Sequence, residues 1–299
     1  MQFQIDPIKR WRQARTRSAS ALRWWRTLAL AVAVSVASAS AIAAPPAAGS
    51  AKAPALELAR LSYVERKVEQ GTSGAWREAR EGTPLRIGDR VRTAKDALLR
   101  IDFPWMAVTV SPSSSVAFPD EYLLAAVLEE GRVALQADGR AILKLVTGEA
   151  AVRGQGQVVV RRQARTTLVT ALAGTFFVEG AGRAVTLAAG TGTVVRAGQA
   201  PLAPLALPER PDGLDPGTDP VYVARGEPVS LRWTGKQPAY LVEVLSFGSD
   251  AVLLQLDVGA PPTLLAIPWQ GTFRWRVVGR DERGLEGRPS PVGFICVDK

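Results

Sequence analysis

Short apolar stretches separated by turn-forming residues recur along most of the chain. From about residue 56 they return every 8–12 residues or so, with Gly, Pro, Ser or Asp between them. Within residues 99–103 apolar and polar side chains alternate, so the apolar ones share one face of an extended strand. This texture predicts an all-β sandwich, barrel or coil. Residues 122–128 could form a short helix, but we favour a strand there. The predicted strands before residue 200 fall at 60–68, 98–103, 107–110, 125–128, 132–135, 142–146, 157–160, 166–172, 176–178, 185–188 and 193–195.

A proline-dense interval separates these strands from a second group. Six prolines fall within residues 201–220, a density that excludes the interior of a sheet and predicts a semi-extended linker at 199–221. Beyond this interval the pattern typical of β-strands returns. So many short strands within the last 80 or so residues predict a small β-sandwich. Its predicted strands fall at 229–233, 240–245, 253–256, 273–278 and 293–297.

The first 43 residues have a different pattern. Residues 1–26 are polar and basic, residues 27–40 are apolar and small, and Ala41-Ile42-Ala43 fits a small-x-small cleavage site. This order predicts a signal peptide at 1–43. The apolar run is short for a membrane span of roughly 20 residues, so a retained N-terminal anchor is the second interpretation. Residues 44–55 are rich in Ala and Pro and read as a tether.

Charge and composition narrow the function. The formal net charge is +9, but residues 1–43 carry +6 of it, and the remaining +3 gives little support for nucleic acid as a partner. The absence of histidine removes the commonest general base and most zinc sites, and the single cysteine, Cys296, cannot form an internal disulfide. We therefore expect no enzymatic activity, no catalytic residue, no metal and no cofactor. Carboxylates converging from separate strands, as in a hydrolase, stay a remote alternative.

Two groups of arginines are candidates for a partner surface. The predicted strands place Arg161, Arg162 and Arg165 around one turn, and they place Arg274 and Arg276 on one face of a strand. Such groups could meet an anionic glycan, a lipid or an acidic protein. The plainer interpretation is a solvated polar face.

Five motifs resemble those of FecR domains, in the order that the family has them, over about residues 58–198. Because each motif alone is weak, their common order carries the resemblance. The matching positions are residues 85–93 (LRIGDRVRT, with Gly88, Asp89 and Thr93), 108–114 (VTVSPSS, with Pro112), 128–133 (LEEGRV, with Gly131), 174–178 (GTFFV, with Gly174, Thr175 and Phe176) and 185–195 (with Gly190).

The resemblance implies a FecR-like β-coil or solenoid-like domain at 56–198, exposed in the periplasm or at the cell surface. The best-known members relay signals from outer-membrane transporters to sigma factors through a cytoplasmic segment. Here only 26 residues precede the apolar run, so we do not expect that anti-sigma role. Gly88-Asp89 suits a chain reversal, because Gly accepts positive φ and Asp bonds the backbone. We expect Gly131 and Gly190 to form reversals too, and Phe176, Val178, Val185 and Leu187 to be core.

The C-terminal part resembles a fibronectin type III-like module at 222–299. The resemblance lies in residues 228–233, 240–244 and 271–278, and it implies that Trp233 and Trp275 point inward. Cys296 is expected to be a small buried residue of the last strand. There is also a weak internal sequence similarity between residues 145–154 and 168–178. It predicts two successive turns of a coil, unless the similarity is due to chance.

Together these patterns predict an exported protein of the bacterial envelope, periplasmic or otherwise outside the inner membrane. We expect a scaffold or sensing module that binds a protein partner and touches the membrane only through an uncleaved N-terminal segment. A peptidoglycan or polysaccharide binding module is the main alternative. Exposed Trp105, Trp233 or Trp269 would favour the glycan, and buried tryptophans would favour a protein partner.

Overall fold

The computed structural model describes residues 57–72, 74–119, 125–137 and 142–298. The chain falls into two units, Met1–Lys52 and Ala53–Lys299. The predicted signal peptide or anchor (1–43) and the predicted tether (44–55) lie outside the described residues. Within the described ranges no helix is long and apolar enough to cross a membrane. All regular structure there is strand, which confirms the all-β prediction.

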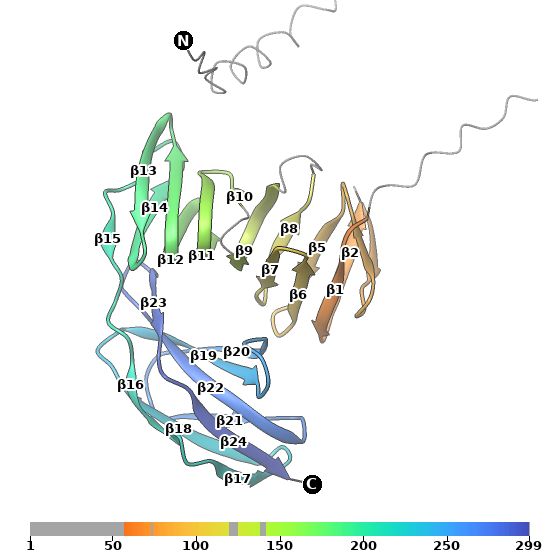
Figure 1. Ribbon diagram of the computed structural model, residues 1–299, viewed down its shortest axis with the longest axis vertical. Coiled ribbons are helices and arrows are strands. Elements are labelled where there is room, and N and C mark those ends of the chain that lie inside the picture. Colours follow the sequence, from red (N-terminus) through yellow and green to blue (C-terminus); the bar gives the residue numbers. More distant parts are fainter. Residues whose placement is uncertain (1–56, 73, 120–124, 138–141, 299) are drawn as a thin grey trace, which may run out of the picture. The chain divides into compact units, whose positions relative to one another are not determined.

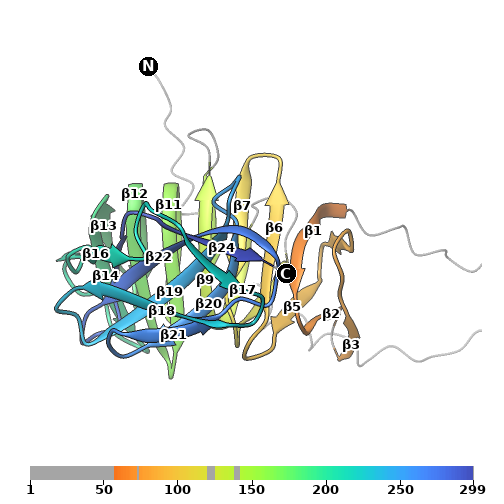
Figure 2. The ribbon, with the colours of Figure 1, turned by 90° about the horizontal axis from the view of Figure 1, so that it is seen from below.

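The first part of the second unit is one hydrogen-bonded sheet of 15 strands (Figure 1). Its main path runs β15-β14-β12-β11-β10-β9-β7-β6-β1-β4, and the other strands pair beside it. Figure 2 shows β6, β7, β9, β11 and β12 running side by side. The strands are β1 (Glu57–Glu65), β2 (Val68–Thr72), β3 (Ala75–Glu78), β4 (Pro84–Arg86), β5 (Arg90–Thr93), β6 (Leu98–Phe103), β7 (Met106–Val110), β8 (Ser115–Ala117), β9 (Ala125–Ala137), β10 (Leu143–Val146), β11 (Ala151–Gln163), β12 (Thr166–Gly180), β13 (Arg183–Ala188), β14 (Thr191–Arg196) and β15 (Leu205–Ala206).

Three long strands bend and change partners along their length. β12 pairs with β14 through Thr166–Ala171 and with β13 through Thr175–Gly180, while β11 runs beside both halves. β9 pairs with β8 and β10 in its first half and with β7 and β11 in its second. Side chains from both halves therefore enter one core, which runs from Leu61 of β1 to Val195 of β14.

Glycines make these bends possible. Gly156 of β11 lies opposite Gly174 of β12, and both have positive φ (112° and 82°). A Cβ atom on Gly174 would lie 1.9 Å from the carbonyl oxygen of Gln155. Gly131 has a φ of 89° but lies inside β9, so the predicted chain reversal there is wrong: the glycine bends one strand and does not separate two. Residues 145–154 and 168–178 do not form two successive turns of a coil, because residues 168–178 all belong to β12, and this agrees with the alternative that their similarity is chance.

The second part consists of two facing sheets. Its strands are β16 (Asp212–Asp215), β17 (Val221–Ala224), β18 (Pro228–Thr234), β19 (Ala239–Ser246), β20 (Val252–Val258), β21 (Thr263–Ala266), β22 (Gly271–Arg280), β23 (Glu286–Pro289) and β24 (Gly293–Asp298). One sheet has the order β16-β18-β21 and the other β17-β24-β22-β19-β20, with β23 beside β22. Both sheets contribute to one core, so the part is a β-sandwich.

Alternation along the strands of the sandwich places its aromatic residues. Trp233 and Trp275 are buried, as the sequence predicts, and Trp233 meets Tyr240 edge to face at 5.3 Å. Cys296 is only half-buried, because it alternates with the buried Ile295 and Val297 and so faces away from the core. The expectation of a buried cysteine is therefore wrong.

The proline-dense interval is not free of strands. β15 and β16 both lie within residues 199–221, and each takes the edge of a sheet. Prolines beside these strands agree with an edge position, since an edge strand leaves one side without ladder partners. The linker prediction is thus too simple, although the exclusion from sheet interior agrees with the structure.

Candidate functional site

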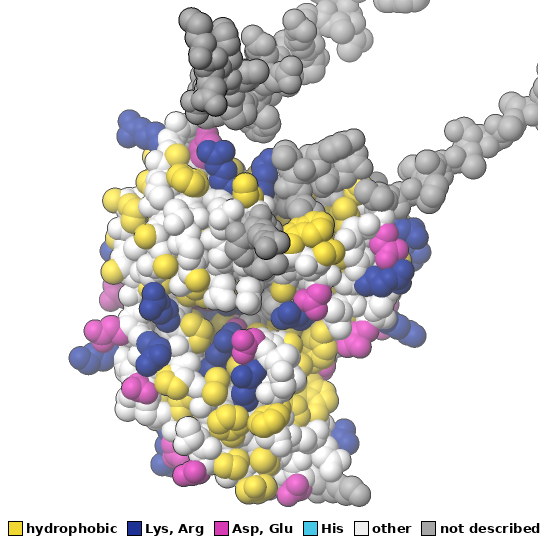
Figure 3. Space-filling model, viewed as in Figure 1, with side chains coloured by type: hydrophobic (Ala, Val, Ile, Leu, Met, Phe, Trp, Pro, Cys, Tyr) yellow, Lys and Arg dark blue, Asp and Glu magenta, His cyan; other side chains and the backbone are white. Residues whose placement is uncertain are grey.

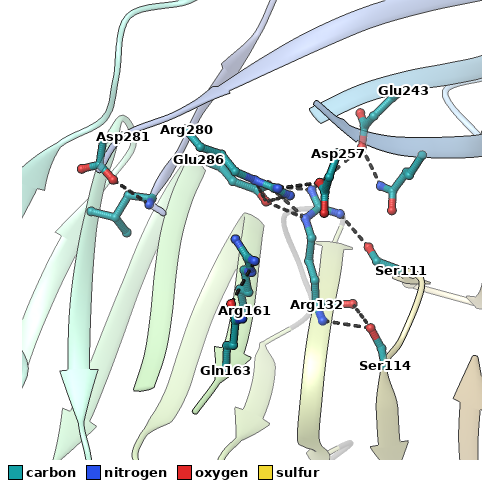
Figure 4. Close-up of polar contacts among 12 residues, drawn as sticks. Ser111, Ser114, Arg132, Arg161, Gln163, Glu243, Asp257, Arg280, Asp281 and Glu286 are labelled. Carbon is teal, nitrogen blue, oxygen red and sulfur yellow. Dashed lines mark hydrogen bonds and ion pairs between the residues drawn. The ribbon is translucent and has the colours of Figure 1, made fainter. Parts of the chain in front are cut away.

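A buried ion pair joins the 15-stranded sheet to the sandwich. Arg132 follows the bend at Gly131 in β9, and Glu286 begins β23. The Nε of Arg132 donates to Glu286 Oε1 at 2.9 Å and its Nη2 donates to Oε2 at 2.7 Å, which is the bidentate geometry that guanidinium and carboxylate groups favour. Both side chains are buried, and Figure 4 shows Arg132 reaching from its strand to Glu286.

Further polar groups hold this pair on both sides. On the sheet side, the Nη1 of Arg132 donates to the hydroxyl of Ser111, and the hydroxyl of Ser114 accepts the backbone N–H of Arg132 at 2.9 Å. On the sandwich side, Arg280 of β22 donates to Glu286 at 2.9 Å and also pairs with Asp257. A buried pair is favourable only when its remaining hydrogen-bonding positions are filled, and these contacts fill them.

The charges shift one another's pKa values. Burial would raise the pKa of Glu286, but Arg132 and Arg280 outweigh burial and lower it to about 2. Burial works against the charged form of Arg132, yet Glu286 and Glu243 raise its pKa above the ordinary value. The carboxylate therefore stays ionised at all physiological pH values, and the contact between the two parts is ionic.

Apolar clusters accompany the ionic contact. Leu98 of β6 packs with Leu245 and Val252 of the sandwich. Leu168 and Val194 of the sheet pack with Leu285, the residue before Glu286. The sheet and the sandwich are thus joined by hydrophobic burial as well as by charge, which indicates a fixed junction.

Two clefts open at this junction. The first, of about 340 Å³, is lined by Arg132, Glu243, Arg276, Glu286 and Arg288 among others. The second, of about 430 Å³, is lined by Lys95, Ser111, Arg161, Gln163 and Arg280 among others. Arginine is prominent in both, so the junction favours oxygen-rich, anionic groups.

The predicted arginines separate into paired and unpaired side chains. Arg162 makes two hydrogen bonds to Glu149 (2.8 and 2.9 Å), Arg274 pairs with Asp250, and Arg276 pairs with Glu243. Arg165 lies at the turn between β11 and β12 with a φ of 62°. Arg161 is half-buried and donates to Gln163 at 3.0 Å, and no carboxylate of the described residues comes within 4.0 Å of it. The two groups therefore do not form one basic surface.

A second feature lies on the outer face of the sheet, away from the core. The register places Lys144, Arg153, Phe177 and Thr186 beside one another on β10, β11, β12 and β13. The side chain of Phe177 is 46% exposed, and the guanidinium of Arg153 lies 5.6 Å from its ring. A shallow groove of about 560 Å³ runs beside this row, between Ile142 and Phe177, with Gly154 and Gly174 in its lining.

Most residues of the five FecR-like motifs contribute to the fold, as turn formers, hydrogen-bonding groups or core side chains. Gly88 turns the chain between β4 and β5 with a φ of 85°, and Asp89 Oδ2 accepts the backbone N–H of Arg86 at 2.7 Å. Gly190 has a φ of 83° between β13 and β14. The hydroxyl of Thr93 donates to the carbonyl of Ser111, next to Pro112 in the turn after β7, while Phe176 is buried and Thr175 faces outward.

The sequence did not reveal the centre of the junction. Arg132 stands beside the motif glycine Gly131, and Glu286 follows a polar turn and begins β23, 154 residues later. Neither residue type nor spacing links them. The one available signal was that Arg132 occupies an apolar-patterned strand, which implies a buried partner of opposite charge.

No protein-family model matches the chain, and no curated protein matches it. Among solved structures it is similar to two crystal structures of a "putative anti-sigma factor" from Parabacteroides distasonis ATCC 8503, at 14% and 15% identity. Each match covers 39% of this chain and 59% of the other chain, with a TM-score of 0.34.

Proposed function

We propose that the protein is an exported FecR-domain protein of the bacterial envelope that binds a protein partner and has no enzymatic activity. The five motifs support the FecR part of the proposal, since all of them fall on one continuous sheet. The sandwich would be its fibronectin type III-like companion. Within the described residues no group of three or more Cys, Asp or Glu side chains could hold a metal ion. Support for a binding function comes from the surface of the sheet.

The row of Lys144, Arg153 and Phe177 is the observation that carries the proposal. Aromatic and arginine side chains dominate the binding energy of protein interfaces, and here they lie together on an open sheet face. In the described part of the chain, neither Lys144 nor Arg153 has an ion-pair partner. A protein segment could place an apolar side chain in the groove beside Phe177 and a carboxylate against Arg153, so that the groove is filled and the arginine is paired.

On the face drawn in Figure 3, basic and acidic side chains are interspersed over the described residues. This mixture gives little support to a long polyanion such as nucleic acid. The junction would serve the partner indirectly, because a fixed sandwich keeps the sheet and its binding row in one orientation.

A capture experiment from envelope fractions tests the proposal. The immobilised protein should retain a specific partner, and both Phe177→Ser and Arg153→Gln should reduce the capture about tenfold or more, as for hot-spot residues worth at least 1.4 kcal/mol. The control is Leu264→Ser, which removes an even more exposed apolar side chain (67% exposed, against 46% for Phe177) from β21 of the sandwich. Equal capture by all variants would place the partner elsewhere and refute the proposed row.

A wall-binding function is the competing outcome. Trp105, in the turn between β6 and β7, is 39% exposed, whereas Trp233 is buried and Trp269 packs against Phe273. One exposed tryptophan is enough for sugar stacking. Co-sedimentation with purified peptidoglycan, lost in Trp105→Ala, would replace the protein partner by a glycan.

A further inference from the structure

The charges at the junction do not balance. Four guanidinium groups meet there, on Arg132, Arg161, Arg276 and Arg280, against the carboxylates of Glu243, Asp257 and Glu286. Figure 4 shows the three carboxylates with Arg132, Arg161 and Arg280. Arg132 and Arg280 share Glu286, Arg280 also pairs with Asp257, and Arg276 pairs with Glu243. Arg161 is left with the amide oxygen of Gln163.

Arg161 lies in a partly buried position, where a cation without a carboxylate partner lowers the stability of the folded protein. It lies half-buried on β11, against the turn at Gly284 between β22 and β23. Burial, and next the positive charge of Arg280, lower the pKa of Arg161 below the ordinary value for arginine. A protein without a use for this charge would be more stable with a neutral side chain at the same position.

The cleft of about 430 Å³ beside Arg161 has the lining of an anion site. Lys95 adds a second cation that has no ion-pair partner among the described residues, and Arg280 lies on the opposite wall. Ser111, Ser113 and Gln163 add hydrogen-bonding groups. Glu130 also lines the cleft and is the one acidic side chain there without an ion pair in the described ranges.

We propose that this cleft binds a small oxyanion, the phosphate or carboxylate group of a ligand, through the guanidinium of Arg161 with Lys95 beside it. The planar guanidinium presents two parallel donors to such a group. Because the walls of the cleft come from both the sheet and the sandwich, the bound anion would add a bridge across the junction. This site is separate from the row around Phe177, which lies on the outer face of the sheet.

Calorimetric titration of the full chain tests the site, with inorganic phosphate in one arm and malonate in the other, at ionic strength held constant with sodium chloride. Saturable one-site binding is expected in at least one arm, and the arm that binds identifies the group. Arg161→Gln should weaken that binding about tenfold or more, the loss of a hydrogen bond to a charged group. No saturable binding in either arm would overturn the proposal.

Arg153→Gln is the matched control, because it removes an arginine from the same strand but from the outer face. It should bind the anion like the unchanged protein, and equal weakening by both variants would show a general effect of charge and overturn the site. Without anion, Arg161→Gln should melt at a temperature no lower than the unchanged protein, which separates lost binding from lost folding. The partner capture described above should be lost in Arg153→Gln and kept in Arg161→Gln, so the two proposals can fail separately.

Discussion

Single residues at the junction contribute through charge. Glu286 accepts hydrogen bonds from two buried arginines. Without its carboxylate, Arg132 would keep only the more distant Glu243, at 3.9 Å, and Arg280 would keep only the ion pair with Asp257. The lowered pKa of Glu286, about 2 in the folded protein, is a stability statement as well. Since the folded-state value lies below the unfolded one, the contribution is fully present above pH 4.5 and is lost as the pH falls towards 2.

Glu286→Gln should therefore destabilise the protein by about 3–5 kcal/mol at pH 7, the cost of breaking a buried pair. Urea unfolding at a series of pH values measures it. Between pH 4.5 and 2 the unchanged protein should lose on the order of 3 kcal/mol that the variant has already lost.

The control is Glu282→Gln, four residues earlier in the exposed turn, where the change should stay within about 0.5 kcal/mol. If both variants unfold at the same urea concentration, the ion pair contributes nothing to folding.

At the scale of an element, the bent strands decide how the sheet closes around its core. β11 and β12 run side by side through their bends because Gly156 and Gly174 face each other there without side chains. The motif at 174–178 thus combines a glycine that permits the bend with Phe176, which is buried by it. Steric exclusion of a side chain at the bend therefore explains why this motif position, Gly174, is a glycine.

Gly174→Ala should destabilise the sheet by about 3–5 kcal/mol, since it adds a contact of 1.9 Å to the carbonyl of Gln155 and a strained positive φ. Gly182→Ala has the same positive φ, at the turn between β12 and β13, with nothing within 4 Å of the new Cβ. It should cost only about 1–2 kcal/mol. Thermal unfolding of the two variants compares them, and equal losses would show that the backbone conformation alone matters.

At the scale of the whole molecule, we expect the junction to make the sheet and the sandwich unfold as one cooperative body. Ionic contacts of Arg132 and the apolar contacts of Leu98 and Leu285 all cross it. Domains with small polar interfaces move and unfold separately, whereas a buried, mixed interface couples them.

Arg132→Leu should uncouple the two parts, because it removes the cation from the sheet side and leaves Glu286 facing an apolar side chain. Scanning calorimetry should show one transition for the unchanged protein and two for the variant. Arg90→Leu breaks the ion pair with Glu129, which lies within the sheet and is partly exposed, and should keep one transition. Two transitions in the unchanged protein would contradict the coupling.

The sequence by itself determined the class of this fold and much of its local geometry. Alternation in 99–103 predicted which side chains of β6 are buried, and Gly88-Asp89 predicted a turn, because both depend on neighbours in the chain. Gly131 was mistaken for a turn, since a bend within a strand and a reversal between strands both need positive φ. The pairing of Arg132 with Glu286 and the isolation of Arg161 were decided by tertiary structure alone. Charge pairing across 154 residues depends on how two separate parts dock, and no local pattern records it.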